Sequence, residues 1–157
     1  MKRSFVRDFR AFLPACLITF LLFLLCSRVY GIFPCGSQSI VWCDMEQQAV
    51  PLLQQFRMLV RSGESISYSL LNAGGMEFYG IFFFFLSNPL SLLALVCDVP
   101  ADLLVNLMVF LKLALASGTA AIWLRRRVPE LEFPMLSLLA VMYGCSGYGL
   151  FYYQNLM

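Results

Sequence analysis

Five consecutive residues, Asp44-Met45-Glu46-Gln47-Gln48, form the densest group of polar side chains in the sequence that could do chemistry. Carboxylates such as those of Asp44 and Glu46 serve in active sites as general bases or as ligands of a divalent metal ion. Two ordinary interpretations stay open: the group is a solvated loop, or Asp44 caps the helix that follows it. We take Asp44 and Glu46 as the candidate catalytic residues.

Lys112 stands alone in an apolar run that extends over residues 103–124. A charged side chain inside a bilayer is costly, so by default it marks a functional site. Two roles stay open: an ion pair with sequence that is absent here, or contact with a ligand such as a lipid-linked phosphate. A helix turns about 100° per residue, which places Lys112 roughly 80° or more from Asp102 and Asn106. We therefore do not expect Lys112 to pair with Asp102.

A turn-rich stretch, Asn72-Ala73-Gly74-Gly75, follows Tyr68-Ser69. The Gly pair allows backbone conformations that other residues resist, so it either closes a simple turn or brings N–H groups to an anionic ligand. The chain has no His, the commonest acid–base group at neutral pH. It also has no P-loop, dinucleotide fingerprint, nucleophile elbow or zinc motif. Basic residues lie at the edges of apolar runs, so we expect no nucleic-acid partner.

The composition indicates that the elements positioning these residues lie in a membrane. The 157-residue chain is 61% hydrophobic and 13% charged, and its mean hydropathy is +0.78. Soluble domains are usually near half apolar and about a quarter charged. We expect an all-α integral membrane protein with three transmembrane helices plus a membrane-embedded re-entrant segment, and the lipid bilayer as a principal partner.

The first transmembrane helix is predicted over residues 11–30, behind a basic start at residues 1–10. A helix of about 20 residues crosses a hydrocarbon core of roughly 30 Å. Pro14 is expected in the first turn of this helix, where a missing N–H costs little. Because the basic side stays in the cytoplasm, we expect a multi-pass plasma-membrane protein with a cytoplasmic N-terminus and an outer loop at residues 31–77. A cleaved signal peptide is the alternative.

The outer loop is expected to contain an amphipathic helix that lies along the membrane surface and stops near Gly63. Its apolar residues recur at steps of three and four: Val50, Leu53, Phe56, Leu59 and Val60. Cys35 and Cys43 flank the first long polar segment. A disulfide between them stays open, because spacing alone does not decide it.

The charge pattern indicates which later segments cross the membrane. Arg125-Arg126-Arg127 follow the second predicted span, residues 101–124, and should lie in the cytoplasm. If residues 78–97 also crossed, this triplet would lie outside. Ser87-Asn88-Pro89 interrupts that run, and Pro disfavours helix at the residue before it. We therefore predict that residues 78–97 form a re-entrant or juxtamembrane segment.

The last apolar run, residues 133–153, follows a predicted cytoplasmic loop at residues 125–132 and forms the third span. Tyr residues crowd its end, as in the aromatic belt at a membrane interface. Within it, Ser146-Gly147-Tyr148-Gly149 indicates a bend or a close contact between helices.

Several short motifs occur in a characteristic order along the chain. They are Gly31-Ile32-Phe33-Pro34-x-Gly36, Trp42-x-Asp44-Met45-x-Gln47-Gln48, Tyr68-Ser69 before Gly74-Gly75, Leu86-Ser87-Asn88-Pro89-Leu90, a span that contains Lys112 and ends in basic residues, and Tyr143-Gly144-x-Ser146-Gly147-Tyr148. From about residue 10 to its end, the chain resembles the N-terminal part of the YfhO family of bacterial multi-spanning membrane proteins. That family is similar to GT-C glycosyltransferases, so the resemblance implies the N-terminal part of a GT-C-like helical bundle.

The resemblance implies an enzyme that transfers a sugar from a polyprenyl-phosphate donor to a cell-surface polymer such as a teichoic acid. In GT-C folds the first outer loop carries an essential acidic residue, as base or metal ligand. Asp44 stands at the matching position, and Glu46 is the second candidate. A divalent metal cofactor stays open, although no metal-binding residue is assigned. The candidate substrate-binding residues are Lys112, Arg57, Gln47 and Gln48.

Family members are several-fold longer and have more spans. The resemblance therefore implies further C-terminal helices of the same protein as partners, and a fragment that is inactive alone. The rival hypothesis is a small non-enzymatic polytopic membrane protein that works at this length as an assembly or scaffold subunit.

Overall fold

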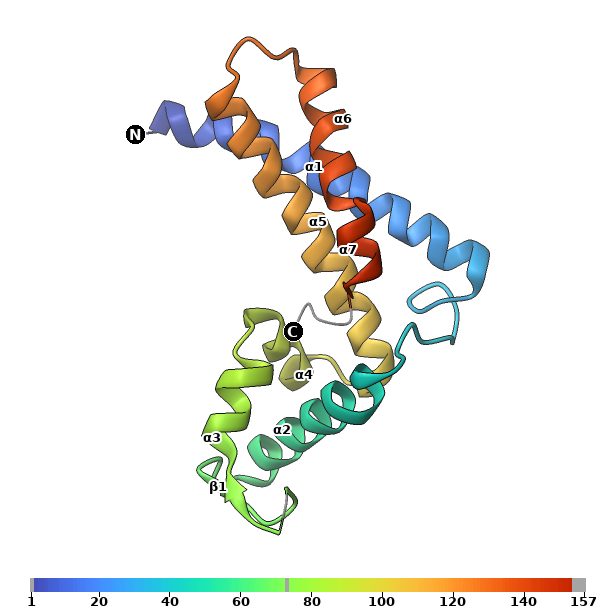
Figure 1. Ribbon diagram of the computed structural model, residues 1–157, viewed down its shortest axis with the longest axis vertical. Coiled ribbons are helices and arrows are strands. Elements are labelled where there is room, and N and C mark those ends of the chain that lie inside the picture. Colours follow the sequence, from blue (N-terminus) through green and yellow to red (C-terminus); the bar gives the residue numbers. More distant parts are fainter. Residues whose placement is uncertain (1, 73, 154–157) are drawn as a thin grey trace. The chain divides into compact units, whose positions relative to one another are not determined.

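The computed structural model describes residues 2–72 and 74–153, with side chains from Val6 onward (Figure 1). The helices and strands, in chain order, are α1 (Lys2–Tyr30), a π-helical turn (Met45–Ala49), α2 (Val50–Ser62), β1 (Tyr68–Ser69), β2 (Met76–Glu77), α3 (Phe78–Ile81), a second π-helical turn (Phe82–Leu86), a 3-10 helix (Pro89–Leu92), α4 (Leu93–Val96), α5 (Ala101–Arg127), α6 (Phe133–Gly144) and α7 (Gly147–Phe151). The prediction of an all-α membrane protein is confirmed. Within the described residues, three segments are long and apolar enough to cross a membrane: Val6–Tyr30, Ala101–Arg127 and Phe133–Phe151.

The chain forms two compact units. The first comprises residues up to Ser37 together with those from Val109 onward, and the second comprises Gln38–Met108. Helix α5 therefore contributes its first two turns to the second unit and its remainder to the first.

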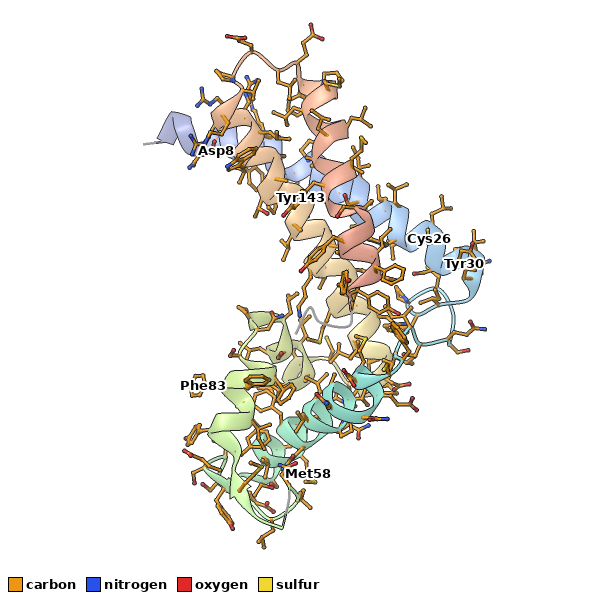
Figure 2. All side chains as sticks on the ribbon, in the orientation of Figure 1. Asp8, Cys26, Tyr30, Met58, Phe83 and Tyr143 are labelled. Atoms are coloured by element: carbon orange, nitrogen blue, oxygen red, sulfur yellow. The ribbon has the colours of Figure 1, made fainter. Side chains whose placement is uncertain are left out.

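In the first unit, α1 and α5 pack side by side in opposite directions. Thr19 near the middle of α1 donates a hydrogen bond to Ser117 Oγ of α5 at 2.7 Å. Phe23, further along α1, stacks on Phe110, which comes earlier in α5, with ring centroids 5.1 Å apart. At the other end, Asp8 (labelled in Figure 2) pairs with Arg126. As the residue number increases along α1, the residue number of the partner in α5 decreases. The two helices are therefore antiparallel.

Small side chains let the three helices of this unit approach closely. One buried cluster consists of Ala11 and Ala15 of α1, Ala121 of α5, and Leu136 and Ala140 of α6. Two glycines in the same unit also lie at contacts: a Cβ on Gly118 would collide with the Phe12 ring, and one on Gly144 would collide with Ser117 Oγ. Enrichment in Ala, Gly, Ser and Thr is expected where helices associate in lipid, because close backbone packing replaces the hydrophobic effect as the driving force.

Pro14 lies in the interior of α1, so its predicted place in the first helical turn is wrong. The helix extends back through the basic start to Lys2. Lys and Arg are good helix formers, and Pro deprives the helix of a single N–H donor, the one that would bond to the carbonyl of Arg10. Favourable residues on both sides therefore carry the helix through the proline.

In the second unit, α2 buries the face that its periodicity predicts. Leu53, Phe56 and Leu59 are buried, whereas Val60 is 41% exposed. Gly63 ends the helix in the left-handed region, with φ of 72°, which is the conformation that Gly adopts at helix C-termini at no steric cost. The predicted stop at Gly63 is confirmed.

Residues 78–96 form two short helical stretches separated by a sharp break. Phe78–Leu86 and Pro89–Val96 are bent by 114°. Asn88 caps the second stretch, because its Oδ1 accepts a hydrogen bond from Leu90 N at 2.9 Å. The break falls at the predicted Ser87-Asn88-Pro89 sequence. A bend of this size fits either a broken span or a re-entrant loop, so the prediction that this segment does not cross stays a prediction.

The helix of the third apolar segment is interrupted near its end. Helix α6 ends at Gly144, and α7 begins at Gly147 after Ser146, whose Oγ accepts a hydrogen bond from Gly149 N at 3.3 Å. This interruption lies where the sequence indicated a bend or a close contact.

Candidate functional site

The polar group predicted as the site gathers on one exposed turn of the second unit. Asp44 immediately precedes the π-helical turn Met45–Ala49, in which Met45 and Ala49 are buried. These two apolar anchors leave the side chains of Asp44, Glu46, Gln47 and Gln48 exposed. The structure therefore brings together four of the six predicted site residues.

The backbone of this turn is closed tightly around Cys43. Glu46 N and Gln47 N both donate to Cys43 O, at 3.0 and 3.3 Å, and Met45 N donates to Trp42 O at 3.1 Å. Cys43 has a positive φ of 52°, a region that non-glycine residues enter at some energetic cost. The Asp44 side chain makes no capping hydrogen bond. The capping interpretation is therefore wrong, and the carboxylate is not engaged in ending the helix.

Asn106 fixes the segment that leads into this turn, a role that its position in the sequence did not reveal. Its side chain is fully buried. Asn106 Nδ2 donates to Gln38 O at 2.9 Å, and Oδ1 accepts from Ile40 N at 3.0 Å. Ser39 Oγ adds a bond to Asp102 O at 2.9 Å. The carboxamide thus pairs with the extended backbone as a neighbouring strand would, which holds residues 38–40 against the start of α5.

Arg57 of α2 is directed at the end of the broken segment. Its Nε donates to Ala94 O at 2.7 Å, and its Nη2 donates to Cys97 O at 3.3 Å. These carbonyls belong to the last turn of α4 and the residue after it, which lack partners within their own helix. One turn further along α2, Arg61 pairs with Asp98 at 3.2 Å. The predicted substrate contact of Arg57 stays a prediction, and the structure gives its guanidinium a position beside residues 94–97.

Lys112 belongs to the first unit and is not part of the Asp44 turn. Its side chain is partly buried in α5. In the part of the chain that the structure describes, it forms no ion pair with an acidic residue. No ion pair between Lys112 and Asp102 is present among these residues. Its contact with a ligand stays a prediction.

The Gly pair closes a hairpin between the two short strands. Tyr68 pairs with Glu77 and Ser69 with Met76. Gly75 N donates to Asn72 O at 2.8 Å, and Gly75 has φ of 127°. The hairpin is held to α2 by Gln55, which donates to Ser69 Oγ at 2.6 Å and accepts from Asn72 Nδ2 at 2.8 Å. The simple-turn interpretation therefore fits; Ala73 itself lies outside the described residues.

Metal binding and a disulfide were both left open by the sequence. Among residues 2–72 and 74–153, no group of three or more His, Cys, Asp or Glu side chains gathers to hold a metal ion. A divalent ion at the turn would find the carboxylates of Asp44 and Glu46 and the amide oxygens of Gln47 and Gln48, and would take further oxygen ligands from water or substrate phosphates. Cys35 and Cys43 are both free thiols.

Comparison with known families bears on the whole chain. A family model described as bacterial membrane protein YfhO matches residues 15–157. No curated protein and no solved structure matches the sequence. The family match covers nearly all of the chain, including the Asp44 turn, the broken segment, α1 from residue 15 onward and the two later apolar helices, and it confirms the resemblance seen in the motifs. The chain therefore belongs to the YfhO family of bacterial membrane proteins.

Proposed function

We propose that this YfhO protein supplies the acidic outer loop of a membrane glycosyltransferase. The observation that carries the proposal is the Asp44 turn. It presents two carboxylates, of Asp44 and Glu46, and the chain that leads into it is held at residues 38 and 40 by buried Asn106. An exposed carboxylate on a fixed loop is suited to accept a proton from a bound hydroxyl group, because its geometry is set before the substrate arrives.

The proposed reaction transfers a sugar from a polyprenyl-phosphate donor to a hydroxyl group of a cell-surface polymer. Asp44 accepts the proton of the acceptor hydroxyl while the oxygen of that hydroxyl forms a bond to the anomeric carbon of the donor sugar. The bond between that carbon and the donor phosphate oxygen breaks, and polyprenyl phosphate leaves with the electron pair. Glu46, Gln47 and Gln48 line the same turn and are proposed to bind the sugar or an accompanying divalent ion.

Lys112 and Arg57 are the proposed cationic partners of the donor phosphate. A positive group stabilises the negative charge that develops on a leaving phosphate. Arg57 keeps its charge while it holds the carbonyls of Ala94 and Cys97. Lys112 is the stronger candidate, because it forms no ion pair among the described residues and lies in an apolar segment where an unpaired charge is costly.

We propose that the N-terminus and the arginine triplet Arg125-Arg126-Arg127 both face the cytoplasm of the cell. The antiparallel pairing of α1 and α5 supports this, as does the Asp8–Arg126 pair. When two spans are antiparallel, the end of the first and the start of the second lie at the same membrane face. Residues 31–100 then begin and end outside, so the segment 78–97 enters and leaves on one side. A reporter fused directly after Arg127 is expected to be active only in the cytoplasm; outside activity overturns this topology.

The catalytic role is tested in cells that carry the complete gene. Asp44→Asn removes the base but keeps the size of the side chain, and loss of about 100-fold or more in surface-polymer glycosylation is expected. Glu64→Gln is the matched control, since Glu64 is an exposed acidic residue of the same loop outside the turn. Membrane levels of both variants are compared by immunoblot.

Normal glycosylation by Asp44→Asn, at an equal protein level, rules out the catalytic assignment. It would leave the rival role of a small assembly or scaffold subunit. That role predicts that Asp44→Asn and Glu64→Gln behave alike, and that the purified chain forms a stable oligomer.

A further inference from the structure

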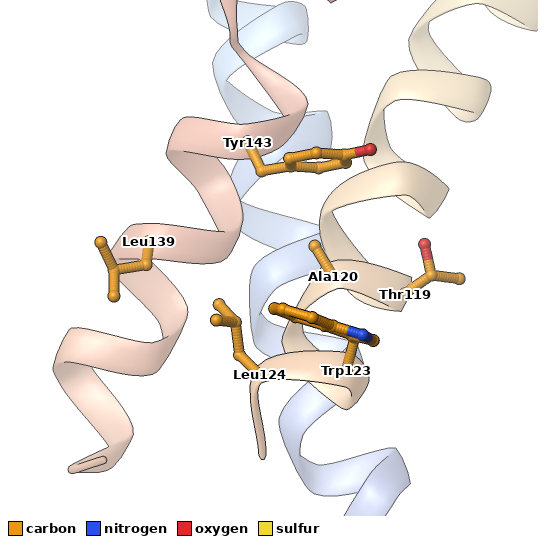
Figure 3. A pocket seen from close by; sticks show the side chains of 6 residues that line it. All are labelled: Thr119, Ala120, Trp123, Leu124, Leu139 and Tyr143. Atoms are coloured by element: carbon orange, nitrogen blue, oxygen red, sulfur yellow. The ribbon is translucent and has the colours of Figure 1, made fainter. Parts of the chain in front are cut away.

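An apolar groove runs along the first unit between α5 and α6. Its volume is about 660 Å³, and it is open to the surroundings of the protein. The groove is lined by Thr119, Ala120, Trp123 and Leu124 of α5 and by Leu139 and Tyr143 of α6. Figure 3 shows the Trp123 and Tyr143 rings on either side of Ala120, whose small side chain leaves the space between them. In a membrane such a groove must be filled.

Arg127, a cationic residue without a hydrogen-bond or ion-pair partner among the described residues, follows the groove along α5. Thr119, Trp123 and Arg127 are spaced four residues apart and so lie on one stripe of α5. The other two arginines of the triplet are engaged with the protein. Arg125 donates to Leu131 O at 3.1 Å, and Arg126 pairs with Asp8. Arg127 is exposed, and among the described residues it has no hydrogen-bond or ion-pair partner.

The dimensions of the groove match those of one lipid chain. From residue 119 to residue 127 the helix rises about 12 Å. One leaflet contributes about 15 Å of hydrocarbon, half of the bilayer core. A chain lying along the groove would therefore keep its headgroup at the level of Arg127. The indole of Trp123, which is 59% exposed, lies one turn deeper, close to where amphipathic rings sit at a membrane interface.

We propose that this groove binds a phospholipid of the surrounding bilayer, with an acyl chain between α5 and α6 and an anionic phosphate headgroup at Arg127. Guanidinium groups bind phosphate oxygens through paired hydrogen bonds, and basic sites between transmembrane helices select anionic lipids. Glu130 and Glu132 of the following loop are exposed carboxylates. The preference for anionic lipid therefore depends on Arg127.

Tryptophan quenching tests the site directly, because the chain has two Trp residues. Trp42→Phe leaves Trp123 as the single reporter. The protein is placed in phosphatidylcholine nanodiscs that contain a small, equal fraction of brominated lipid, either phosphatidylglycerol or phosphatidylcholine. Bromine on an acyl chain quenches an indole that it contacts. We expect brominated phosphatidylglycerol to occupy the site about fivefold more strongly, the preference expected of one arginine at the membrane surface.

Two further variants locate the binding. Arg127→Gln should abolish the preference for phosphatidylglycerol while quenching by both lipids persists. The matched control Arg28→Gln, at an exposed arginine of α1, should keep the preference. Ala120→Leu fills the groove and should lower quenching by both lipids, with circular dichroism as the check of folding.

Three outcomes overturn the proposal. Equal quenching by the two brominated lipids in the parent protein removes the headgroup site. Absence of quenching by either lipid shows that protein, from a second copy or from another helix, covers the groove. Retention of the preference in Arg127→Gln removes Arg127 from the site and overturns the proposal in the same way.

Discussion

The two units hold their backbones together in different ways. In the first unit, long helices meet through small residues and a hydroxyl pair, as at Thr19 and Ser117. In the second unit, irregular segments are held by long polar side chains that bind backbone groups. Asn106 binds residues 38–40, and Arg57 binds the carbonyls of Ala94 and Cys97.

The difference follows from how each kind of element satisfies its own backbone. A helix forms its hydrogen bonds internally, so its neighbours need only fit closely. Loops and broken helices leave N–H and C=O groups unpaired, and a buried unpaired group costs free energy. Carboxamide and guanidinium side chains supply the missing partners. Substitutions should therefore act through steric clash in the first unit and through lost hydrogen bonds in the second.

The largest effect is expected at Asn106. Asn106→Leu keeps the approximate volume but removes the hydrogen bonds to Gln38 O and Ile40 N. The local stability of residues 38–42 should fall by about 2–3 kcal/mol, or at least about 30-fold in amide exchange. Hydrogen exchange measured by mass spectrometry checks this. Asn88→Ala, which removes the cap at Leu90, is the control and should leave exchange in residues 38–42 unchanged. Unaltered protection in Asn106→Leu would refute the positioning role.

A steric effect is expected at Gly144. In Gly144→Ala, the new methyl group meets Ser117 Oγ and lies 2.8 Å from Leu113 O, so stability should fall by about 1–3 kcal/mol. Gly147→Ala is the matched control, because a Cβ there meets nothing within 4 Å. It should be neutral or stabilise the protein by up to about 1 kcal/mol, because Ala lowers the conformational entropy of the unfolded chain. Thermal unfolding in detergent compares the two, and equal Tm values would contradict close packing at Gly144.

The role of Arg57 predicts an intermediate effect on the broken segment. Arg57→Gln removes the two hydrogen bonds to the carbonyls of Ala94 and Cys97 and should loosen this end by about 1.5 kcal/mol, which corresponds to roughly tenfold faster thiol labelling of Cys97. Arg57→Lys should restore only part of the protection, since an ammonium group lacks the planar fork. Full rescue by Lys would show that charge alone matters.

The smallest effect is expected at Arg61. Its pair with Asp98 is exposed, with side-chain exposures of 49% and 87%, and such pairs contribute about 0–1 kcal/mol. Arg61→Gln should change the labelling of Cys97 much less than Arg57→Gln does. The residual effect should disappear in high salt, which screens exposed pairs. An effect equal to that of Arg57→Gln would mean that ion pairing, and not carbonyl binding, holds this segment.

Much of the fold could be predicted because hydropathy and turn chemistry are local. The three apolar helices, the stop at Gly63 and the break at Ser87-Asn88-Pro89 are all encoded within a few residues. The predicted place of Pro14 was wrong because a proline is tolerated inside a helix when strong helix formers flank it, and the helix includes the basic start that the prediction left outside it. The position of the Asp44 turn followed from its polarity alone.

The supports of the candidate site could not be predicted in the same way. Asn106 binds Ile40 and Gln38, which are separated from it by 66 and 68 positions in the sequence. The atoms that it binds belong to the backbone, which every residue has. No residue type at positions 38 or 40 signals this contact. Arg57 is similar, because its acceptors are carbonyl groups 37 and 40 residues distant. The charge of Arg57 suggested contact with a ligand, whereas its observed hydrogen bonds go to the carbonyl groups at the end of α4.

The carboxamide of Asn106 also sets where this loop can change length. A residue inserted between Ile40 and Asp44 would add about 3.3 Å of chain between the backbone held at Ile40 and the buried anchor Met45. Extra residues before Gln38 lie ahead of the backbone groups that Asn106 binds. Natural variants of this protein should therefore gain and lose residues ahead of Gln38, and keep a constant spacing from Ile40 to Asp44.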